Sequence, residues 1–408
     1  MHHIVMPLQN HGVKRFSFAH CVVIFALLAA VILPRPSLAW GPLGHRMVAE
    51  TAMQLLEKID PKSTQGHGGW GSFLSRHRFE LGYYSIIPDS HFRAEDGMKG
   101  KLESPTHFFD LDVVLPLGTL SEKKVLEAIA QIPADYADYQ TWMKPKLPAH
   151  ITHLDDLGTA PWRIEQLMAL IHHTLKDVKS GKGTYQEGRR SEGDAKKIYE
   201  ALRYIGILTH YTADMSMPHH SSEDWNSYAK GHGGIHFYFE NDCVDELEPG
   251  VSEAALKMAV TKSEAWLKQW RIEKSPPSKV VMNALWESFQ AIDRVLATDK
   301  KHAVTEIAEK SATKKSGKNA KRKPARFACQ SFKPLLVEQI AKGAALTSLM
   351  VSWVLPKDVD FASPAPLKFF DFEIHPEYIE PSYQKSDEKL TALRTLAAPK
   401  AQAWKKSH

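Results

Sequence analysis

Apolar residues recur every three or four positions along most of the chain. Between residues 195 and 214, Ile198, Leu202 and Ile205 would lie on one face of a helix, and Pro218 follows the end of this pattern. The same period predicts further helices over residues 42–58, 160–175, 252–270, 279–297 and 334–353. The chain is therefore predicted to be all-α in class, that is, mainly helical.

Two stretches depart from the helical pattern. Residues 106–114 are the best candidate for a strand or an extended segment. Residues 356–385 are rich in proline and aromatic residues without a period, and a charged, weakly helical tail continues to His408. These features predict one domain over residues 40–355, followed by a C-terminal extension over residues 356–408.

A targeting segment is predicted at the N-terminus. Two basic residues precede thirteen apolar residues, 21–33, and Ser-Leu-Ala at 37–39 supplies small residues at the places that a signal peptidase reads. Thirteen residues are too few to span a bilayer as a helix. We therefore expect a signal peptide over residues 1–39, cleavage before Trp40 and a secreted or periplasmic protein. An uncleaved membrane anchor is the alternative.

The charge of the chain is concentrated in one place. The 408 residues include 52 Lys+Arg and 47 Asp+Glu, a composition that excludes a disordered polyelectrolyte and a multi-span membrane protein. Residues 310–326 hold eight basic residues and no acidic one. Without this run and residues 1–39, 41 basic residues face 47 acidic ones, so the rest of the chain is mildly acidic. The run is predicted to be a flexible, solvated insertion. Contacts with nucleic-acid phosphates or with anionic lipid headgroups are the alternatives.

Two of the three cysteines, Cys243 and Cys329, follow the predicted signal peptide. In an exported protein they either form one disulfide or remain two buried thiols. Spacing along the chain does not establish that they are close in space, so both alternatives stay open.

Histidine is frequent, with 21 residues, and two of them begin the same motif. His210-x3-Asp214 lies on the predicted helix 195–214, and His236-x3-Glu240 follows within the same 31 residues. Four-residue spacing puts both side chains of a pair on one helix face, and imidazole nitrogen and carboxylate oxygen are common zinc ligands. One such pair is typical of an ion pair or a buried structural histidine. Two pairs, with a His-His doublet between them, predict a metal site.

The start of the predicted mature chain extends this hypothesis. Trp40-Gly-Pro-Leu-Gly-His45, followed in order by the two His-x3-acid motifs, resembles the zinc-dependent superfamily of single-strand-specific nucleases and bacterial zinc phospholipases C. The resemblance covers residues 40–355. It implies a single-domain, multi-helix phospholipase C/nuclease-like fold with a trinuclear zinc cleft. It also implies that the free amine and the carbonyl of Trp40 bind one zinc, which requires removal of the signal peptide.

The resemblance carries nine ligand positions over to this chain. The family's spacing selects His220 rather than His219 from the doublet, and Asp89 and His107 match intervening motifs. On their own, these two residues would be interpreted as a loop carboxylate and a strand-end histidine. The implied first site is Asp89, His107, His210 and Asp214; the second is His220, His236 and Glu240; the third is Trp40 and His45, with Asp214 as a bridge.

The implied chemistry is hydrolysis of a phosphate ester, because divalent ions held close together can clamp a phosphate and lower the pKa of a water molecule. Asp89 would orient the attacking water and is the predicted catalytic residue. For the substrate, Phe108 would stack on a base, Asp110 would read the edge of that base, and Arg93 would clamp a phosphate. Ordinary core packing of Phe108 and Phe109, and a solvated loop charge at Arg93, are the alternatives.

Features of both branches of the superfamily are present. The short spacing at 40–45 and the His-Phe-Phe-Asp motif at 107–110 resemble the nucleases, whereas Glu240 and the short 220–236 spacing resemble the phospholipases. The sequence therefore predicts a secreted hydrolase of ester bonds: a phosphodiesterase with three zinc ions, first an endonuclease or 3′-nucleotidase for single-stranded nucleic acid. A phospholipase C acting on phospholipid headgroups is the alternative, and a non-catalytic exported zinc-binding module is the third hypothesis. No protein partner is implied.

Overall fold

The computed structural model describes residues 40–60, 68–94, 97–117, 120–186, 193–248, 250–271, 275–359, 361, 368–369, 376–384 and 387–396. Of these residues, 68% lie in helices and 3% in strands, which confirms the mainly helical prediction. The predicted signal peptide, residues 1–39, lies outside the described residues, and its cleavage stays a prediction.

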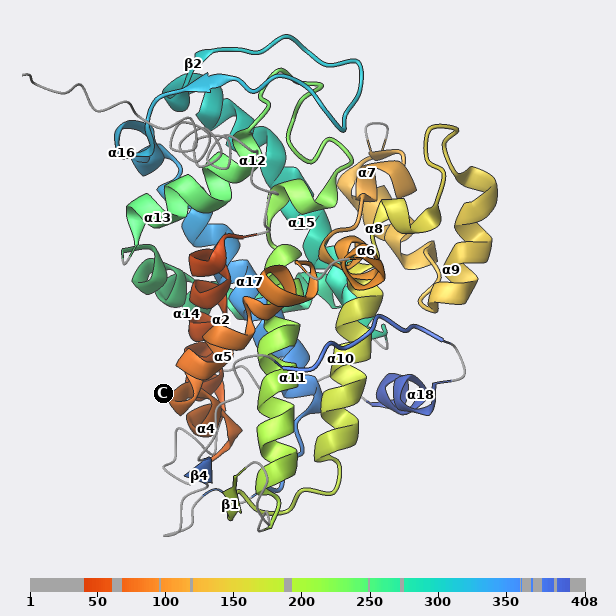
Figure 1. Ribbon diagram of the computed structural model, residues 1–408, viewed down its shortest axis with the longest axis vertical. Helices are drawn as coiled ribbons and strands as arrows, with labels where there is room; N and C mark the ends of the chain where they lie inside the picture. The colour runs from red at the N-terminus through yellow and green to blue at the C-terminus, as the bar shows by residue number, and fades with distance from the viewer. Residues whose placement is uncertain are drawn as a thin grey trace, which may run out of the picture. The chain divides into compact units, whose positions relative to one another are not determined.

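The helices predicted from the apolar period are all present. They are α2 (Pro42–Ile59), α10 (Ala160–Leu175), α11 (Ala195–Asp214), α14 (Gly250–Trp270), α15 (Pro277–Thr298) and α17 (Lys333–Val354). α17 packs against α2, α11 and α14, and α11 also packs against α10 (Figure 1). The apolar faces that defined these helices in the sequence therefore meet in one hydrophobic core.

α17 is the one helix among the described residues that is long and apolar enough to cross a membrane, with a mean hydropathy of 1.2 over its most apolar window. However, 89% of that window is buried inside the protein. Its apolar surface is covered by the neighbouring helices, as expected for the central helix of a folded core.

Shorter helices cover the long ones. They are α4 (Trp70–Arg76), α5 (Arg78–Tyr84), α6 (Met98–Glu103), α7 (Leu111–Val114), α8 (Glu122–Gln131), α9 (Tyr136–Met143), α12 (Ile235–Phe237), α13 (Cys243–Leu247), α16 (Ala325–Ala328) and α18 (Glu388–Thr395). Single turns of 3₁₀ helix include Ser104–His107, Pro218–Ser221 and Cys329–Ser331, and turns of π helix include Pro88–Phe92 and Tyr238–Asp242. Two predicted ligands, Asp89 and Glu240, lie in π turns, a conformation often found at functional sites.

Residues 106–114 form no strand, and of the predicted extended segment only the middle is found. The segment begins in the 3₁₀ turn Ser104–His107, which Pro105 opens, has an extended main chain at Phe108, and ends in α7. The apolar residues that suggested a strand are buried: Phe109 and Leu111 are fully inaccessible to solvent. Burial of an irregular segment therefore produced the apolar pattern of a strand without the strand.

The strands among the described residues are two or three residues long and form two pairs. β1 (Thr184–Tyr185) pairs in parallel with β4 (Lys368–Phe369), and β2 (Val304–Glu306) pairs antiparallel with β3 (Lys321–Arg322). β3 belongs to the basic run 310–326, so this run is part of a folded hairpin rather than a free insertion. Its lysines are exposed, as predicted.

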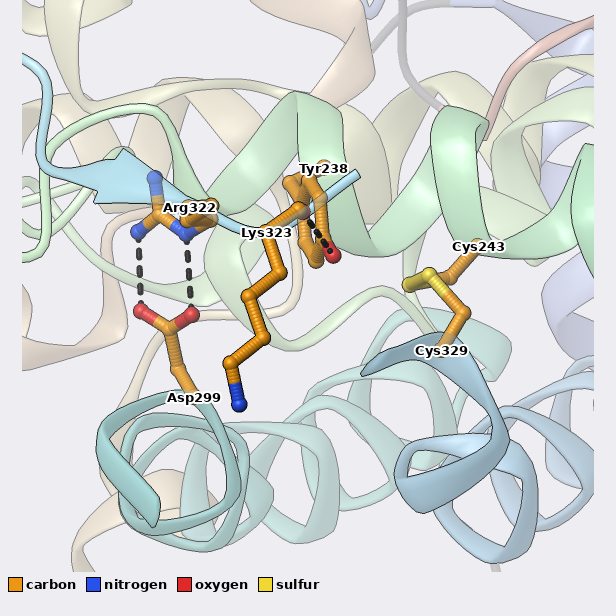
Figure 2. Close-up of a disulfide and its surroundings, with 6 residues drawn as sticks. All are labelled: Tyr238, Cys243, Asp299, Arg322, Lys323 and Cys329. Atoms are coloured by element: carbon orange, nitrogen blue, oxygen red, sulfur yellow. Dashed lines mark hydrogen bonds and ion pairs between the residues drawn. A yellow bond between two sulfur atoms is a disulfide. The ribbon is translucent and has the colours of Figure 1, made fainter. Parts of the chain in front are cut away.

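Cys243 and Cys329 form a disulfide that connects α13 to the 3₁₀ turn Cys329–Ser331 (Figure 2). Both cysteines are fully buried, and 86 positions separate them in the sequence. Cross-links of this kind stabilise small domains by about 2–5 kcal/mol. The alternative of two buried thiols is thereby excluded for this structure.

The described part of the C-terminal extension packs against α10. Arg394 of α18 forms ion pairs with Asp135 at 3.1 Å and with Glu165 of α10 at 2.9 Å. The main chain at Ile379 accepts a hydrogen bond of 2.7 Å from the buried Arg163. The domain boundary predicted at residue 355 is therefore no structural boundary for residues 376–384 and 387–396, because they share the core of the preceding helices.

Candidate metal centre

Buried histidines and carboxylates gather in three groups whose ligand atoms lie within 4.8 Å of one another. We name the groups by their carboxylates. The Asp89 group is His45, Asp89 and His210; the Asp214 group is His107, His210 and Asp214; the Glu240 group is His220, His236 and Glu240. The groups include eight of the nine predicted ligands and could each hold a metal ion.

The Asp214 group is built on the last turn of α11. The four-residue spacing brings Nε2 of His210 to 3.4 Å from Oδ2 of Asp214, and the sequence motif is thereby realised in the helix. Nδ1 of His107 lies 2.9 Å from that Nε2 and 3.2 Å from the same carboxylate oxygen. Two ring nitrogens and a carboxylate oxygen that lie this close together have the geometry of a potential cation site.

The Asp89 group joins α2 and the π turn Pro88–Phe92 to the same helix. Nε2 of His45 lies 3.6 Å from Oδ1 of Asp214 and 3.9 Å from Oδ2 of Asp89. The rings of His45 and His210 stack with centroids 3.9 Å apart. Asp214 also lies 3.5 Å from Nδ1 of His220, so its two oxygens face residues of all three groups. The Asp89 and Asp214 groups therefore share His210, and the Glu240 group adjoins them through the ring of His220.

The Glu240 group is assembled from two short segments, the 3₁₀ turn Pro218–Ser221 and the turns Ile235–Phe237 and Tyr238–Asp242. Nε2 of His236 lies 2.8 Å from Oε2 of Glu240 and 3.2 Å from Nε2 of His220. Nδ1–H of His220 donates to the carbonyl of His107 at 2.7 Å, and Nδ1–H of His236 donates to the carbonyl of Trp225 at 2.8 Å. With these protons placed, both Nε2 atoms are acceptors that face each other, an arrangement that a cation between them would stabilise.

The main chain also orients His210, whose Nδ1–H donates to the carbonyl of Ser85 at 2.7 Å. Three ligand histidines thus present Nε2 to the centre because a carbonyl holds Nδ1. Such second partners commonly fix the tautomer and orientation of metal-binding imidazoles. These carbonyl partners could not be predicted from the sequence, because every residue has a carbonyl and only the fold selects three of them.

The donor atoms fit a metal because several lack any other partner. Both ring nitrogens of His45 and Oδ1 of Asp214 are buried and accept or donate no hydrogen bond within the part of the chain that the structure describes. Buried polar atoms without partners are rare in folded proteins, since each is destabilising by about 1–3 kcal/mol. Nitrogen and oxygen donors without sulfur suit zinc and other borderline divalent ions.

Burial controls the protonation of the metal-free centre. It raises the pKa of Asp89 to about 7, against the opposing effect of the Arg93 guanidinium, and it raises the pKa of Asp214 well above its usual value, with the nearby carboxylate of Asp89 as the next cause. Burial lowers the pKa of His210 to about 3 and that of His45 well below its usual value. The imidazoles of His45 and His210 are therefore neutral and ready to bind, whereas the carboxyl groups of Asp89 and Asp214 must release protons when a cation enters.

Trp40 is fully buried beside the centre. Its indole N–H donates to the carbonyl of Ala213 at 2.8 Å, one residue before Asp214. This contact holds the predicted mature N-terminus near the shared carboxylate. Ligation by the amine and carbonyl of Trp40 stays a prediction.

A buried network behind His107 was not predicted. Glu103 and Arg163 are both fully buried and lie 3.4 Å apart, and Glu103 accepts hydrogen bonds from Thr106 at 3.1 Å and from Tyr211. Oε1 of Glu103 is 3.7 Å from Nε2 of His107, so the network supports the side of the ring that faces away from the centre. The signal that could have revealed it is an acid four residues before a ligand histidine, the third occurrence of that spacing.

The predicted substrate-binding residues lie around this centre. Nη1 of Arg93 is 3.4 Å from Oδ1 of Asp89, and the Arg93 side chain is 28% exposed, so the guanidinium is both close to the ligands and reachable. Phe108 is half-buried, whereas Phe109 is fully buried and packs against Trp162, as the core-packing alternative expects. Asp110 is buried, and this raises its pKa well above the usual value.

His219 is buried and outside the three metal groups. Its Nε2 lies 3.1 Å from Oγ of Ser227, and its ring stacks on that of His236 with centroids 5.8 Å apart. The choice of His220 over His219 as a ligand therefore agrees with the geometry. His219 instead supports the face of a ligand ring.

Comparisons with protein-family models, with curated proteins and with solved structures find no significant match for this chain. The resemblance to zinc nucleases and phospholipases C therefore depends on the sequence motifs, and membership of that superfamily stays a prediction.

Proposed function

We propose that this protein is an exported zinc-dependent phosphodiesterase of the nuclease type, with single-stranded nucleic acid or nucleotides as substrates. One observation carries the proposal: Asp214 faces ligands of all three groups, so the cations would lie next to one another rather than in separate structural sites. Neighbouring cations are the usual arrangement for in-line displacement at phosphorus. Isolated structural zinc sites need no shared ligand.

The resemblance divides the ligands into three sets, although His45 also lies with Asp89 and His210 in the structure. Asp89, His107, His210 and Asp214 would hold one zinc, and His220, His236 and Glu240 a second. His45 and the main chain of Trp40 would hold the third, with Asp214 shared. When bound, zinc ions in such a centre stabilise the negative charge of the phosphate and lower the pKa of water.

The chain's own groups supply positioning and proton transfer. Asp89 is the most exposed of the eight side-chain ligands, at 7%, so its carboxylate would orient the attacking water and accept its proton. Arg93, held beside Asp89, would bind a phosphate oxygen through its remaining N–H groups. Phe108, half-buried next to His107, offers a ring face on which a base could stack.

The test uses protein that begins at Trp40, assayed on single-stranded nucleic acid and on phosphatidylcholine, with zinc and with chelator. We expect zinc-dependent cleavage of nucleic acid that chelator abolishes. Cleavage of lipid alone would assign the phospholipase C alternative instead. No turnover of either substrate by zinc-loaded protein would contradict the enzyme hypothesis and leave the non-catalytic zinc-binding module.

A matched pair of variants separates the roles of Asp89 and Arg93. Asp89→Asn should reduce kcat strongly, because it removes the proton acceptor. Arg93→Gln should mainly raise KM, because it removes a phosphate contact at the edge of the centre. Arg46→Gln on the exposed side of α2, where Arg46 pairs with Glu50, serves as the control for loss of a surface cation.

A further inference from the structure

The basic hairpin, residues 304–323, is fixed to the loop that connects ligands of the Glu240 group. The amides of Ala308, Ser311 and Ala320 donate to carbonyl oxygens of the segment 228–233, at N···O distances of 3.0, 3.1 and 2.9 Å. These bonds fall on both arms of the hairpin. The hairpin therefore has a defined place beside the metal centre.

Arg322 anchors the base of the hairpin. Its Nε and Nη2 donate to the two oxygens of Asp299, both at 2.8 Å (Figure 2). Its Nη2 and Nη1 also donate to the carbonyls of His232 and Gly233, at 2.7 and 2.9 Å. Asp299 is fully buried and accepts a further bond of 2.7 Å from Nδ1 of His232. One guanidinium thus ties the hairpin to the end of α15 and to the turn before His236.

The tip of the hairpin reaches acidic residues next to the metal centre. Nζ of Lys314 forms an ion pair of 3.0 Å with Glu223, whose amide donates to Asp112 at 3.0 Å. The pKa of Asp110 is raised by burial and by these two carboxylates, and Lys315 and Lys314 oppose the shift, which places both lysines within electrostatic range of Asp110. The amide of Phe109 donates to the carbonyl of the ligand His220 at 3.0 Å, so the tip of the hairpin lies against two joined segments that carry the ligands His107 and His220.

Several cations of the hairpin are available for a ligand. Lys310 and Lys315 are exposed and form no ion pair with any residue in the described ranges. Lys318 and Lys321 pair only with the exposed Glu309 and Glu306. Exposed pairs of this kind contribute little and exchange partners readily. The hairpin therefore presents a row of cations to solvent on a chain that is otherwise mildly acidic.

We propose that the basic hairpin binds the backbone phosphates of a single-stranded nucleic acid and holds the strand beside the metal centre. This inference rests on the proposed function and adds a polymer-binding surface to it. Spaced lysines on an ordered hairpin suit the repeated charges of a phosphate backbone. Residues 311–319 contain no aromatic side chain and no aliphatic one larger than alanine, so the tip lacks the apolar groups that insert into a bilayer.

The test compares K310E/K315E with the control pair K257E/K262E, which reverses two exposed lysines of α14. The probe is an oligothymidylate of about 20 nucleotides with phosphorothioate linkages, which resist hydrolysis. Its affinity for the zinc-loaded chain is measured over a range of salt concentrations. Loss of two phosphate contacts should lower the salt slope, d log K against d log [salt], by about 1.4 in magnitude. The control pair should keep the wild-type slope.

Equal slopes for K310E/K315E and the control would overturn the proposal. So would a wild-type chain that binds vesicles of phosphatidylserine and phosphatidylcholine through these lysines but does not bind the oligomer. The neutral variant K310Q/K315Q should give an intermediate affinity, and circular dichroism verifies folding. The readout is binding and does not depend on catalysis. A wild-type chain that binds the oligomer through the hairpin yet cleaves no phosphodiester would therefore support the binding role of the hairpin and contradict the proposed catalytic function.

Discussion

The Asp214 group and the Glu240 group have similar ligands but are positioned differently. In the Asp214 group, two ligands share the last turn of a twenty-residue helix that is buried between α10 and α17. In the Glu240 group, the ligands come from turns of three to five residues. Short turns have little stability of their own. The comparison indicates that the Glu240 group depends on braces from distant parts of the chain.

Two such braces are visible in Figure 2. The disulfide Cys243–Cys329 lies three residues after Glu240, and the ion pair Arg322–Asp299 holds the turn before His236. In addition, Tyr238, between the two ligands, donates to the carbonyl of Lys323 at 2.9 Å. The hairpin and the disulfide therefore hold both ends of the ligand segment, whereas α11 needs no equivalent support.

The largest effect is expected from Asp214→Asn, because two of the three proposed zinc sites share this carboxylate. The amide removes the negative charge that both sites share, and we expect these two sites to weaken by about 10–100-fold while the Glu240 group changes least. Isothermal titration calorimetry with zinc provides the measurement. Loss of a single site, with the other two unchanged, would contradict the shared position of this carboxylate.

Arg322→Gln should weaken zinc binding at the Glu240 group and leave zinc binding at the Asp214 group unchanged. It leaves Asp299 buried with only part of its partners, a change that typically destabilises by about 3–5 kcal/mol. We expect one zinc to bind more weakly, and Co²⁺ spectra to change for one of the sites. Lys321→Gln, one residue earlier and exposed, is the control. Equal weakening of all sites in Arg322→Gln would show that the hairpin does not act locally.

A smaller effect is expected when one extra residue precedes Trp40. The added peptide bond removes the free amine, so we expect loss of one zinc per chain while the Asp214 and Glu240 groups keep theirs. Inductively coupled plasma mass spectrometry gives the count. Unchanged stoichiometry and activity would show that the N-terminal amine is no ligand.

The smallest predicted effect is a pH dependence of zinc affinity that is specific to the Asp89 group. Because burial raises the pKa of Asp89 to about 7 in the metal-free protein, zinc must displace a proton from this carboxyl below that pH. Zinc affinity at this site should therefore fall by about tenfold for each pH unit below 7, and level off above it. Asp89→Asn should remove this component. The same pH slope in Asp89→Asn would assign the proton to another group.

Features of the fold and of the site that depend on local spacing could be predicted from the sequence. The apolar period identified the long helices, and His-x3-acid spacing on α11 identified the Asp214 pair, because a helix turns spacing into proximity. Residues outside helices were harder to place: 106–114 proved to be turns. The carbonyls of Ser85 and Trp225 and the contact of Arg322 with Asp299 join positions far apart in the chain, so only the fold could reveal them.

The most direct test of a shared polynuclear centre is the zinc content of protein that begins at Trp40, after exhaustive dialysis against zinc-free buffer at neutral pH. The account predicts three zinc ions per chain, and loss of phosphodiesterase activity in step with their removal by chelator. A content of one zinc or none, or activity that persists after complete removal, would contradict it.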